Sequence, residues 1–339
     1  MSTASTINAY AVLEAGGPFK TYQIAAGELG ATEVELEIMY CGICHSDLSM
    51  IENEWGIGQY PMVAGHEVIG RVTAMGEQVA HLKKGTVVGL GWNSGYCETC
   101  HTCRIGDLNL CREAKFTILT NGGFADKARA DMSSLVVIPD GVDYASAGPL
   151  LCAGITVFNP LVQFDIKPTD KVAVIGIGGL GHLALKFFHA WGCEVTAFTS
   201  SEEKRKEALA LGAHKTLNSR DPAEIQAAAM SFDFILSTVN VSLDWDLYIQ
   251  ALKPKGRLHF VGAVTNPIQF TLFPLLFGQR SISASPVGSP GTIETMLEFV
   301  AHHKIKPEIE IFPMSQIEAA FEHLKSGKAK YRIVLSQEG

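Results

Sequence analysis

The 339-residue sequence lacks the features that mark several large classes of proteins. It has no basic run or stripe and a formal net charge of −8, so we expect no binding to the phosphates of nucleic acids. No apolar run reaches the roughly 18 residues of a membrane-spanning helix, and residues 1–17 lack the basic start and apolar core of a secretory signal. We therefore expect a cytoplasmic protein that binds neither nucleic acid nor membrane.

Cysteine is also sparse, with eight residues in the chain, but four of them fall within the segment CETCHTCRIGDLNLC at 97–111. In a long cytoplasmic chain, such a cluster indicates a metal site or a catalytic site rather than disulfide bonds. Four thiolates form a closed tetrahedral zinc site, which has no free position for water and cannot activate a substrate. An iron–sulfur cluster is an alternative with the same ligand count. The predicted ligands of this structural zinc are Cys97, Cys100, Cys103 and Cys111.

The chain consists of three blocks of different character. Residues 7–145 contain short alternating strands separated by glycine and polar turns, which is typical of a twisted β-rich domain. From residue 150, apolar strands alternate with helices, as in a parallel doubly wound sheet. From residue 285 the pattern changes again, and we expect this tail to fold back onto the first block. The predicted fold is α/β, with a β-rich catalytic domain over 1–150 and 286–339 and a doubly wound domain over 151–285.

The segment Gly176-Ile177-Gly178-Gly179-Leu180-Gly181 fits the dinucleotide pattern G-x-G-x-x-G. It follows the apolar strand VAVI and opens a helix, and this context favours a dinucleotide site over an ordinary glycine-rich turn. The first glycine permits a tight turn, the second lets the backbone approach a pyrophosphate, and the last lets helix pack on strand. The helix N-terminus would then face the phosphates.

The end of the next strand lacks the Asp or Glu that an NAD site usually places about 20 residues beyond the glycines. It reads Thr199-Ser200-Ser201, and Lys204 and Arg205 follow at the start of the next helix. Hydroxyl donors and nearby cations suit a 2′-phosphate, so we predict NADP(H) as the cofactor. Glu202 and Glu203 argue against this choice, although acids in a first turn also favour the helix dipole.

A second group of candidate ligands is dispersed along the chain: Cys44 in CGICHSDL, His66 and Glu67 in GHEVIGRV, and Cys152 in GPLLCAGITVF. Taken singly, each has a structural explanation, such as a buried core thiol. These motifs, the four-cysteine segment, VIGIGGLGHLA and the Thr-Ser-Ser strand end occur together in the order of one family. The sequence resembles the zinc-dependent medium-chain alcohol dehydrogenases, in particular the cinnamyl-alcohol-dehydrogenase-like branch and its bacterial aldehyde-reductase relatives. The fold that this resemblance implies is a GroES-like catalytic domain plus a Rossmann domain.

The resemblance implies that Cys44, His66 and Cys152 bind a catalytic zinc, which would be the second zinc of the chain. Two thiolates and one imidazole leave a fourth position for water or substrate. Glu67 would ligate the zinc when water or substrate leaves. Asp47 would orient His66 by a hydrogen bond to the ring.

The same resemblance gives Ser46 the role of the hydroxyl that passes a proton toward the cofactor ribose. The family often carries a histidine three residues further on, where this chain has Ser49. A serine does not ionise near neutrality, so it passes a proton only by hydrogen-bond exchange or through water. The sequence leaves open how this proton relay ends.

The remaining implied roles concern cofactor and substrate. Trp55 and Trp92 lie where the family lines its substrate channel, and aromatic walls suit cinnamyl, benzyl or medium-chain aliphatic substrates. Core packing of the β-rich domain is the alternative for either ring. The implied cofactor contacts are His45 near the pyrophosphate, Thr156 near the nicotinamide, and Gly176, Gly178, Gly179, Leu180, Gly181, Thr199, Ser200, Ser201, Lys204, Thr238, Val239 and Gly262.

The predicted function is that of an NADP(H)-linked alcohol dehydrogenase or aldehyde reductase. Hydride would pass between the nicotinamide and an aldehyde or primary alcohol held at the zinc, and we expect a homodimer or homotetramer. An NAD-linked polyol or formaldehyde dehydrogenase on the same scaffold is the enzymatic alternative. A zinc-ribbon binding module is the non-enzymatic one, and the acidic charge and the intact glycine turn argue against it. A third alternative is the zinc-free quinone-reductase branch. That branch lacks both metal sites, whereas this sequence carries the predicted ligands of both.

Overall fold

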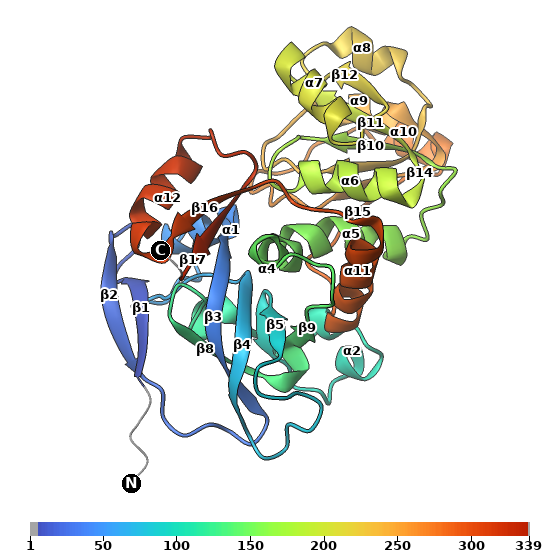
Figure 1. The fold of residues 1–339 in the computed structure, drawn as a ribbon. Helices are drawn as coiled ribbons and strands as arrows, with labels where there is room; N and C mark the ends of the chain where they lie inside the picture. Colours follow the sequence, from blue (N-terminus) through green and yellow to red (C-terminus); the bar gives the residue numbers. More distant parts are fainter. Residues whose placement is uncertain (1–5, 338–339) are drawn as a thin grey trace. The chain divides into compact units, whose positions relative to one another are not determined.

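The protein, described over residues 6–337 as a computed structural model, divides into two compact units (Figure 1). Unit 1 runs to Ile155 and resumes at Val287, and unit 2 spans Thr156–Pro286. The chain therefore leaves the first unit once and returns to it. The large sheet of unit 1 accordingly contains strands from both ends of the sequence.

Unit 1 is built on a seven-stranded sheet in the order β16-β17-β3-β4-β5-β9, with β8 pairing β3 outside that path. Alternating burial explains the strands: in β3, Leu36 and Ile38 are buried and Glu37 between them is exposed. The strands are β3 (Glu33–Ile43), β4 (Val68–Met75), β5 (Val87–Leu90), β8 (Lys127–Asp131), β9 (Leu135–Val137), β16 (Ile309–Pro313) and β17 (Arg332–Ser336). Two smaller sheets pair β1 (Thr6–Val12) with β2 (Phe19–Ala25) and β6 (Asn93–Gly95) with β7 (Lys115–Phe116).

Short helices connect these strands. They are α1 (His45–Ile51), α2 (His101–Arg104), α3 (Thr117–Thr120), α4 (Tyr144–Ala147), α11 (Pro290–His303) and α12 (Ile317–Lys325), with 3₁₀ turns at Leu108–Leu110, Met132–Ser134, Gly148–Leu151 and Met314–Gln316. Helix α5 (Ala153–Gln163) contains the boundary between the units.

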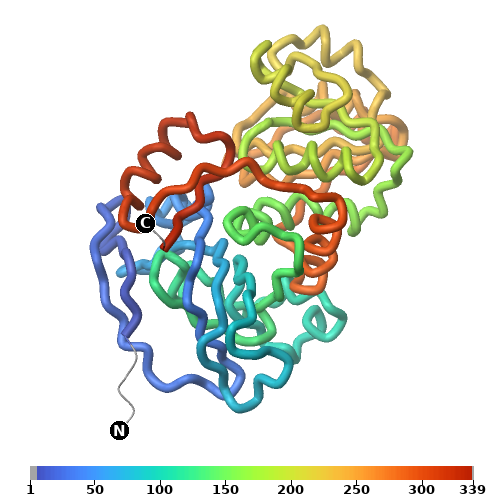
Figure 2. The backbone as a smooth tube through the Cα atoms, in the orientation of Figure 1, coloured from blue at the N-terminus to red at the C-terminus, as the bar shows by residue number. Residues whose placement is uncertain are grey.

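The C-terminal tail supplies two strands of the unit 1 sheet. Strand β17 pairs antiparallel with β3, where Val334 lies opposite Gly42, and β16 pairs parallel with β17. Figure 2 shows this red end of the chain beside the blue N-terminal strands. A side chain at the start of β17 can therefore reach residues that follow β3 in the sequence.

Unit 2 is a six-stranded parallel sheet in the order β12-β11-β10-β13-β14-β15. Val172, Ala173 and Val174 of the central strand β10 are completely buried, as expected where helices cover both faces. The strands are β10 (Lys171–Ile175), β11 (Glu194–Thr199), β12 (Lys215–Asn218), β13 (Phe232–Ser237), β14 (Leu252–Phe260) and β15 (Ser281–Ala284); the helices are α6 (Gly181–Trp191), α7 (Glu202–Ala210), α8 (Pro222–Ala227), α9 (Trp245–Ala251) and α10 (Leu272–Gly278). This order is the doubly wound one, in which the strand sequence reverses at β10. The predicted α/β fold class is confirmed.

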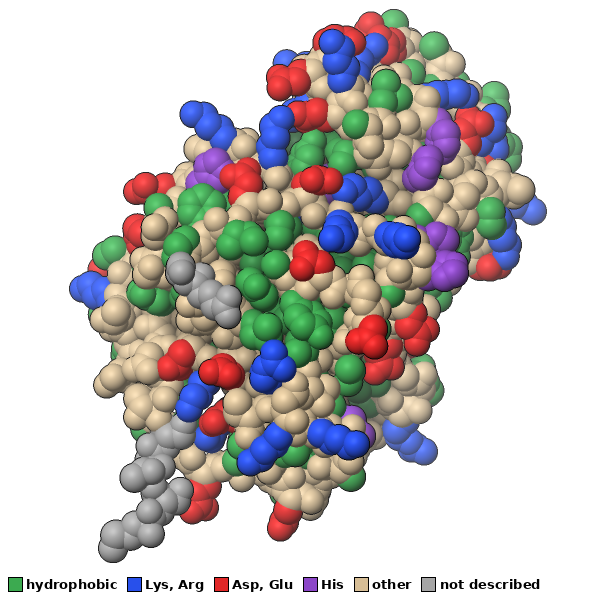
Figure 3. Space-filling model, viewed as in Figure 1, with side chains coloured by type: hydrophobic (Ala, Val, Ile, Leu, Met, Phe, Trp, Pro, Cys, Tyr) green, Lys and Arg blue, Asp and Glu red, His purple; other side chains and the backbone are tan. Residues whose placement is uncertain are grey.

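The charged side chains on the surface are mixed in sign, as the sequence without a basic run predicts. Figure 3 shows cationic and anionic side chains intermingled on the face in view. Among the described helices, none alone is long and apolar enough to span a membrane. One pair, Tyr144–Leu151 with Ala153–Gln163, reaches that length and composition only across a bend of 57°.

Candidate functional site

Four side chains from distant parts of the sequence meet in unit 1. The ligand atoms of Cys44, His66, Glu67 and Cys152 all lie within 4.8 Å of one another, and the four residues are buried. The two sulfur atoms are 3.8 Å apart, and His66 Nε2 is 3.2 Å from Cys152 Sγ. Two thiolates on one tetrahedral zinc stand about 3.8 Å apart, because each Zn–S bond is about 2.3 Å long. The donor set therefore fits one zinc ion.

Asp47 fixes two of these ligands. Cys44 is the N-cap of α1, and Asp47 Oδ2 accepts a hydrogen bond from its backbone N–H at 2.8 Å. The other oxygen, Oδ1, accepts from the backbone N–H of Gly65 at 2.9 Å and lies 2.9 Å from His66 Nδ1. When Nδ1 carries the proton, Nε2 offers its lone pair to a metal. One fully buried carboxylate thus ties α1 to the loop that carries the histidine.

The electrostatics of the cluster favour a bound cation. Burial by itself lowers the pKa of His66, but the charge and hydrogen bond of Asp47 outweigh it and leave that pKa well above its usual range. A hydrogen bond from Cys152 holds the pKa of Cys44 well below its usual range. The same hydrogen bond, together with burial, raises the pKa of Cys152. A metal ion that binds to this site would replace protons held by His66 and Cys152.

Glu67 is held by an arginine that the sequence analysis missed. The Arg332 guanidinium, at the start of β17, donates to Glu67 Oε1, and the residues are 5% and 0% exposed. Burial raises the pKa of Glu67, and the positive charge of Arg332 acts against that rise. The other oxygen, Oε2, has no hydrogen-bond partner among the described residues. A buried carboxylate oxygen without a partner is costly, and a nearby cation would satisfy it.

The four-cysteine segment forms a second cluster in unit 1. The sulfur atoms of Cys97, Cys100, Cys103 and Cys111 lie within 4.8 Å of one another, and none of the four forms a disulfide. Cys97 Sγ is 4.0 Å from Cys103 Sγ and 3.5 Å from Cys111 Sγ. The hydroxyl of Thr102, 3.2 Å from Cys100 Sγ, helps to lower the pKa of Cys100 to about 6. Four sulfurs at these separations fit a tetrahedral zinc with no open position.

In unit 2 the glycine turn lies between β10 and α6, at the strand where the sheet order reverses. Gly176 has a φ of +87°, and a Cβ on Gly181 would stand 1.9 Å from the carbonyl oxygen of Gly176, so both positions require glycine. A Cβ on Gly178 would meet no atom within 4 Å, so the backbone there is open to a ligand. Thr238, after β13, donates to the carbonyl of Gly176 at 2.7 Å. This turn fits a dinucleotide phosphate.

The strand end predicted to bind a 2′-phosphate lies after β11. Thr199 is 3% exposed, and its hydroxyl has no hydrogen-bond partner among the described residues. Ser201 caps α7 by accepting from the backbone N–H of Lys204 at 3.3 Å. Arg205 is occupied by Glu224 at 3.1 Å, so the exposed Lys204 is the nearer cation for a phosphate.

The remaining predicted cofactor contacts are distributed between the units. In unit 1, His45 is exposed at the start of α1. Those of unit 2 are Thr156, which is 7% exposed, and Gly179, Leu180, Ser200, Val239 and Gly262 in the loops that follow strands β10, β11, β13 and β14. In parallel sheets, ligands bind at such carboxyl-end loops.

An aromatic cluster borders the candidate metal ligands. The ring of Trp92 lies 4.8 Å from that of His66, edge-on, and 6.2 Å from that of Trp55. Phe116, which the sequence analysis did not identify, adds a third ring 5.8 Å from Trp92. The three rings are half-buried and pack against the core of unit 1. Core packing and a binding wall are therefore compatible roles for both tryptophans.

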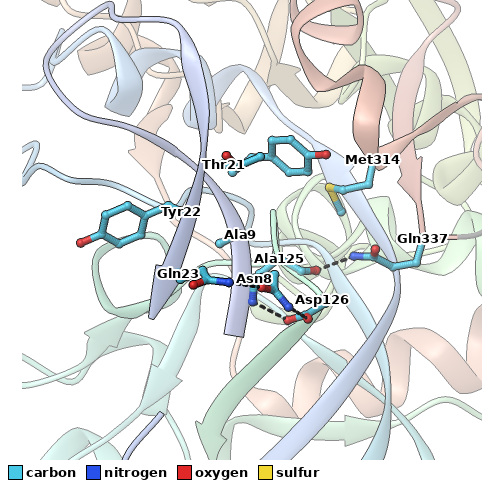
Figure 4. Close-up of a pocket in the computed structure, with 10 residues that line it drawn as sticks. Asn8, Ala9, Thr21, Tyr22, Gln23, Ala125, Asp126, Met314 and Gln337 are labelled. Atoms are coloured by element: carbon cyan, nitrogen blue, oxygen red, sulfur yellow. Dashed lines mark hydrogen bonds between the residues drawn. The ribbon is translucent and has the colours of Figure 1, made fainter. Parts of the chain in front are cut away.

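A separate cavity of about 630 Å³ lies beside the β1–β2 hairpin (Figure 4). Its polar side chains bond to one another: Asn8 Nδ2 donates to Asp126 at 2.7 Å, and Gln23 donates to Asn8 at 3.0 Å. No candidate metal ligand is among the residues that line it.

Comparison with known proteins identifies the family of the chain. Residues 30–140 match the alcohol dehydrogenase GroES-like domain, and residues 179–302 match the zinc-binding dehydrogenase model. The chain is 60% identical over 331 residues to aldehyde reductase AdhA of Synechocystis sp., covering 97% of this chain and 98% of that one. It is similar in structure to the cinnamyl alcohol dehydrogenase SbCAD4 of Sorghum bicolor, with TM-score 0.94 and 36% identity, and to the NADP(H) complex of CAD from Helicobacter pylori, with TM-score 0.90 and 30% identity; each comparison covers 98% of both chains. The predicted family is confirmed: the chain belongs to the zinc-binding medium-chain alcohol dehydrogenases.

Proposed function

We propose that this alcohol dehydrogenase is an NADP(H)-linked aldehyde reductase that acts on aromatic or medium-chain aliphatic aldehydes and oxidises the corresponding primary alcohols. The observation that carries the proposal is the buried cluster of Cys44, His66 and Cys152 beside the ring of Trp92. Three protein ligands suit a catalytic rather than a structural zinc. An adjoining aromatic surface favours planar or apolar substrates over polyols and formaldehyde.

The side chains around the cluster have distinct tasks in this proposal. When bound, the zinc polarises the carbonyl and the nicotinamide supplies or accepts the hydride. Asp47 keeps His66 in the tautomer that binds metal, and Arg332 holds Glu67 against the cluster. Ser46 Oγ lies 3.6 Å from Cys44 Sγ, which supports a role in exchanging a proton with the substrate oxygen.

The preference for NADP(H) is supported by the end of β11. There the Thr199 hydroxyl is buried without a partner, and Lys204 is not engaged in an ion pair among the described residues. A 2′-phosphate would accept hydrogen bonds from such groups. The Helicobacter pylori relative is a complex with NADP(H).

A paired assay tests the function. Initial rates are measured with NADPH and with NADH against cinnamaldehyde, benzaldehyde, hexanal and formaldehyde, and zinc is quantified per chain. We expect two zinc ions, faster rates with NADPH, and formaldehyde as the poorest of the four substrates. A preference for NADH together with formaldehyde as the best substrate would replace the proposal with the formaldehyde-dehydrogenase alternative.

We also propose that the protein works in the cytoplasm as a homo-oligomer associated through unit 2. Helix α10 exposes Leu272, Phe273, Leu276 and Phe277, of which Phe277 is 83% exposed. Within residues 6–337, strand β15, at one edge of the sheet, pairs only with β14. Apolar patches and open edges of this kind commonly mark protein interfaces. Eight free cysteines suit a reducing compartment.

A further inference from the structure

A buried histidine outside the metal clusters joins the last two strands of unit 2. His259, on β14, is 0% exposed. Its Nδ1 lies 2.8 Å from the hydroxyl oxygen of Ser283 on β15, and its Nε2 lies 2.9 Å from that of Ser285, which follows β15. The Arg257 guanidinium, also on β14, donates to the Ser283 hydroxyl at 3.1 Å. These four side chains, the His259 network, lead toward the carboxyl end of β15.

The contacts of the His259 network fix the direction in which its hydrogen bonds are donated. Arg257 has no acceptor and must donate to Ser283, so the hydroxyl hydrogen of Ser283 is free for His259 Nδ1. The ring is neutral, because burial and, secondly, the charge of Arg257 lower the pKa of His259 to about 4. Nε2 then carries the one ring proton and donates it to the hydroxyl oxygen of Ser285.

Two aromatic rings hold this arrangement in place. The ring centroid of Phe164 lies 5.0 Å from that of His259, edge-on, and the ring centroid of Phe234 lies 5.9 Å away. The Arg257 guanidinium lies 4.1 Å from the centroid of Phe164. The imidazole is therefore fixed by packing as well as by hydrogen bonds, and the donor direction of the network is fixed with it.

The network ends on a hydroxyl that keeps its own hydrogen. Ser285 is half-buried, and within residues 6–337 its hydroxyl has no partner other than His259, to which it is an acceptor. Its backbone N–H donates to the carbonyl of Phe260 at 3.3 Å, at the end of β14. The hydroxyl hydrogen of Ser285 is therefore available to a ligand at the carboxyl end of the sheet.

The position of Ser285 in the sheet indicates which part of a dinucleotide it would meet. In a doubly wound sheet the two nucleotide halves lie on opposite sides of the point where the strand order reverses. The predicted 2′-phosphate contacts, such as Thr199, follow β11 on one side of β10. Ser285 follows β15 on the other side, beyond β13 and β14. Its half of the sheet corresponds to the nicotinamide riboside.

We propose that His259 is a positioning residue that makes the Ser285 hydroxyl a hydrogen-bond donor to the nicotinamide riboside half of the cofactor. This inference rests on the proposed function, which supplies the dinucleotide. The carboxamide carbonyl and the ribose hydroxyls of that half are oxygen acceptors for such a donor. Breaking the network should therefore weaken the binding of the whole dinucleotide and leave the binding of its adenosine half unchanged.

Equilibrium binding to the zinc-loaded protein tests this expectation, with NADP⁺ and with 2′,5′-ADP, which lacks the nicotinamide riboside. We expect Ser285→Ala and His259→Asn each to raise the Kd of NADP⁺ about threefold to tenfold, as loss of one hydrogen bond does. The Kd of 2′,5′-ADP should stay within about twofold of wild type. The control is Ser281→Ala, at the start of β15, which should bind both ligands within about twofold of wild type.

Substitutions at position 259 separate positioning from simple packing. Asparagine can accept from Ser283 but is too short to reach Ser285, whereas the longer glutamine brings its amide nitrogen to the place of Nε2. His259→Gln should therefore recover most of the NADP⁺ affinity that His259→Asn loses. The double variant His259→Asn with Ser285→Ala should bind NADP⁺ no more than about twofold more weakly than either single variant, because both break one contact.

A readout without cofactor comes from the nitrogen resonances of His259, assigned by their loss in His259→Gln. At neutral pH, we expect Nε2 to give the signal of a protonated nitrogen and Nδ1 that of an unprotonated one. The opposite tautomer would overturn the inference, because the hydroxyl of Ser285 would then donate to His259 rather than to a ligand.

Two binding results would also overturn it: wild-type affinity of Ser285→Ala for NADP⁺, or an equal loss of affinity for NADP⁺ and 2′,5′-ADP. Because Ser285 is half-buried, its variant decides the question even where His259→Asn fails to fold. Failure of the proposed function looks different, since wild type itself would then prefer NADH or show no activity on aldehydes. With an NADH preference, the same comparison is made with NAD⁺ and AMP, and the tautomer of His259 is still measured.

Discussion

The two cysteine clusters of unit 1 offer similar ligands in different surroundings. The cluster of Cys97, Cys100, Cys103 and Cys111 comes from one segment, and two of its members are only half-buried. The other cluster joins residues 44, 66–67 and 152, all buried, and two charged side chains, Asp47 and Arg332, support it. A contiguous set of ligands can close around a metal with little help from the fold. A dispersed set depends on the fold, which here also supplies the charged side chains beside the ligands.

Removing a ligand from the dispersed cluster should have the largest effect. We expect His66→Ala to lower kcat by about 10³-fold or more, because a Lewis-acid zinc supplies several kcal/mol to the reaction. Zinc content should fall from two ions per chain to one, as measured by elemental analysis of the folded protein. The control is Cys41→Ala, because Cys41 is a neighbouring buried thiol that does not belong to the cluster of ligand atoms. If His66→Ala kept both ions and its activity, the two clusters would not differ in role.

Truncating the hydroxyl beside the cluster should have the next largest effect. We expect Ser46→Ala to reduce kcat by about 10–100-fold through loss of proton transfer, while Ser49→His leaves the enzyme active. Both variants should retain two zinc ions, so steady-state rates are compared at equal zinc content. Equal turnover of Ser46→Ala and wild type would remove proton transfer at Ser46 from the mechanism.

The ion pair between Arg332 of β17 and Glu67 can be tested by substitution. Arg332→Met leaves Glu67 buried without its partner and should destabilise unit 1 by about 3–5 kcal/mol. The double variant Arg332→Met with Glu67→Gln should regain much of that stability, because no uncompensated charge remains. Denaturant unfolding measures both, with turnover of the folded fraction as a second readout. No recovery in the double variant would show that Arg332 acts through packing alone.

Changing the contiguous cluster should affect chemistry least. We expect Cys100→Ser to lower Tm by about 5 °C or more through loss of a structural metal, while kcat per folded molecule changes less than about twofold. Thermal unfolding and zinc content of the soluble fraction measure the two effects separately. A large loss of kcat in molecules that remain folded would contradict the purely structural role.

The sequence predicted the parts of the molecule that depend on local pattern. Period-two alternation marked strands such as β3 and β4, and the glycine turn marked the passage from β10 to α6. The cluster of Cys97, Cys100, Cys103 and Cys111 was predicted because these residues lie close together in the sequence. Cys44 and Cys152 were joined only by the resemblance to a family, because no local rule connects residues that are 108 positions apart.

Two of the residues that escaped the sequence analysis, Arg332 and Glu54, did so for physical reasons. Arg332 reaches Glu67 only because β17 pairs with β3, and such long-range pairing leaves no trace in local periodicity. Glu54 is an exposed acid in a turn, like many others in the chain. Its relation to Ser49 depends on how α1 ends, which places a residue five positions later within hydrogen-bond distance.

The arrival of Arg332 from the last strand also sets an order of events during synthesis. A ribosome that has released residues 1–155 has made every candidate metal ligand, yet the counter-charge of Glu67 lies 177 residues beyond that point. Nascent chains would carry an uncompensated carboxylate at the site until β17 (Arg332–Ser336) has been made. Activity should therefore appear only after β17 leaves the exit tunnel, and a stop codon placed just before codon 332 should yield protein without activity.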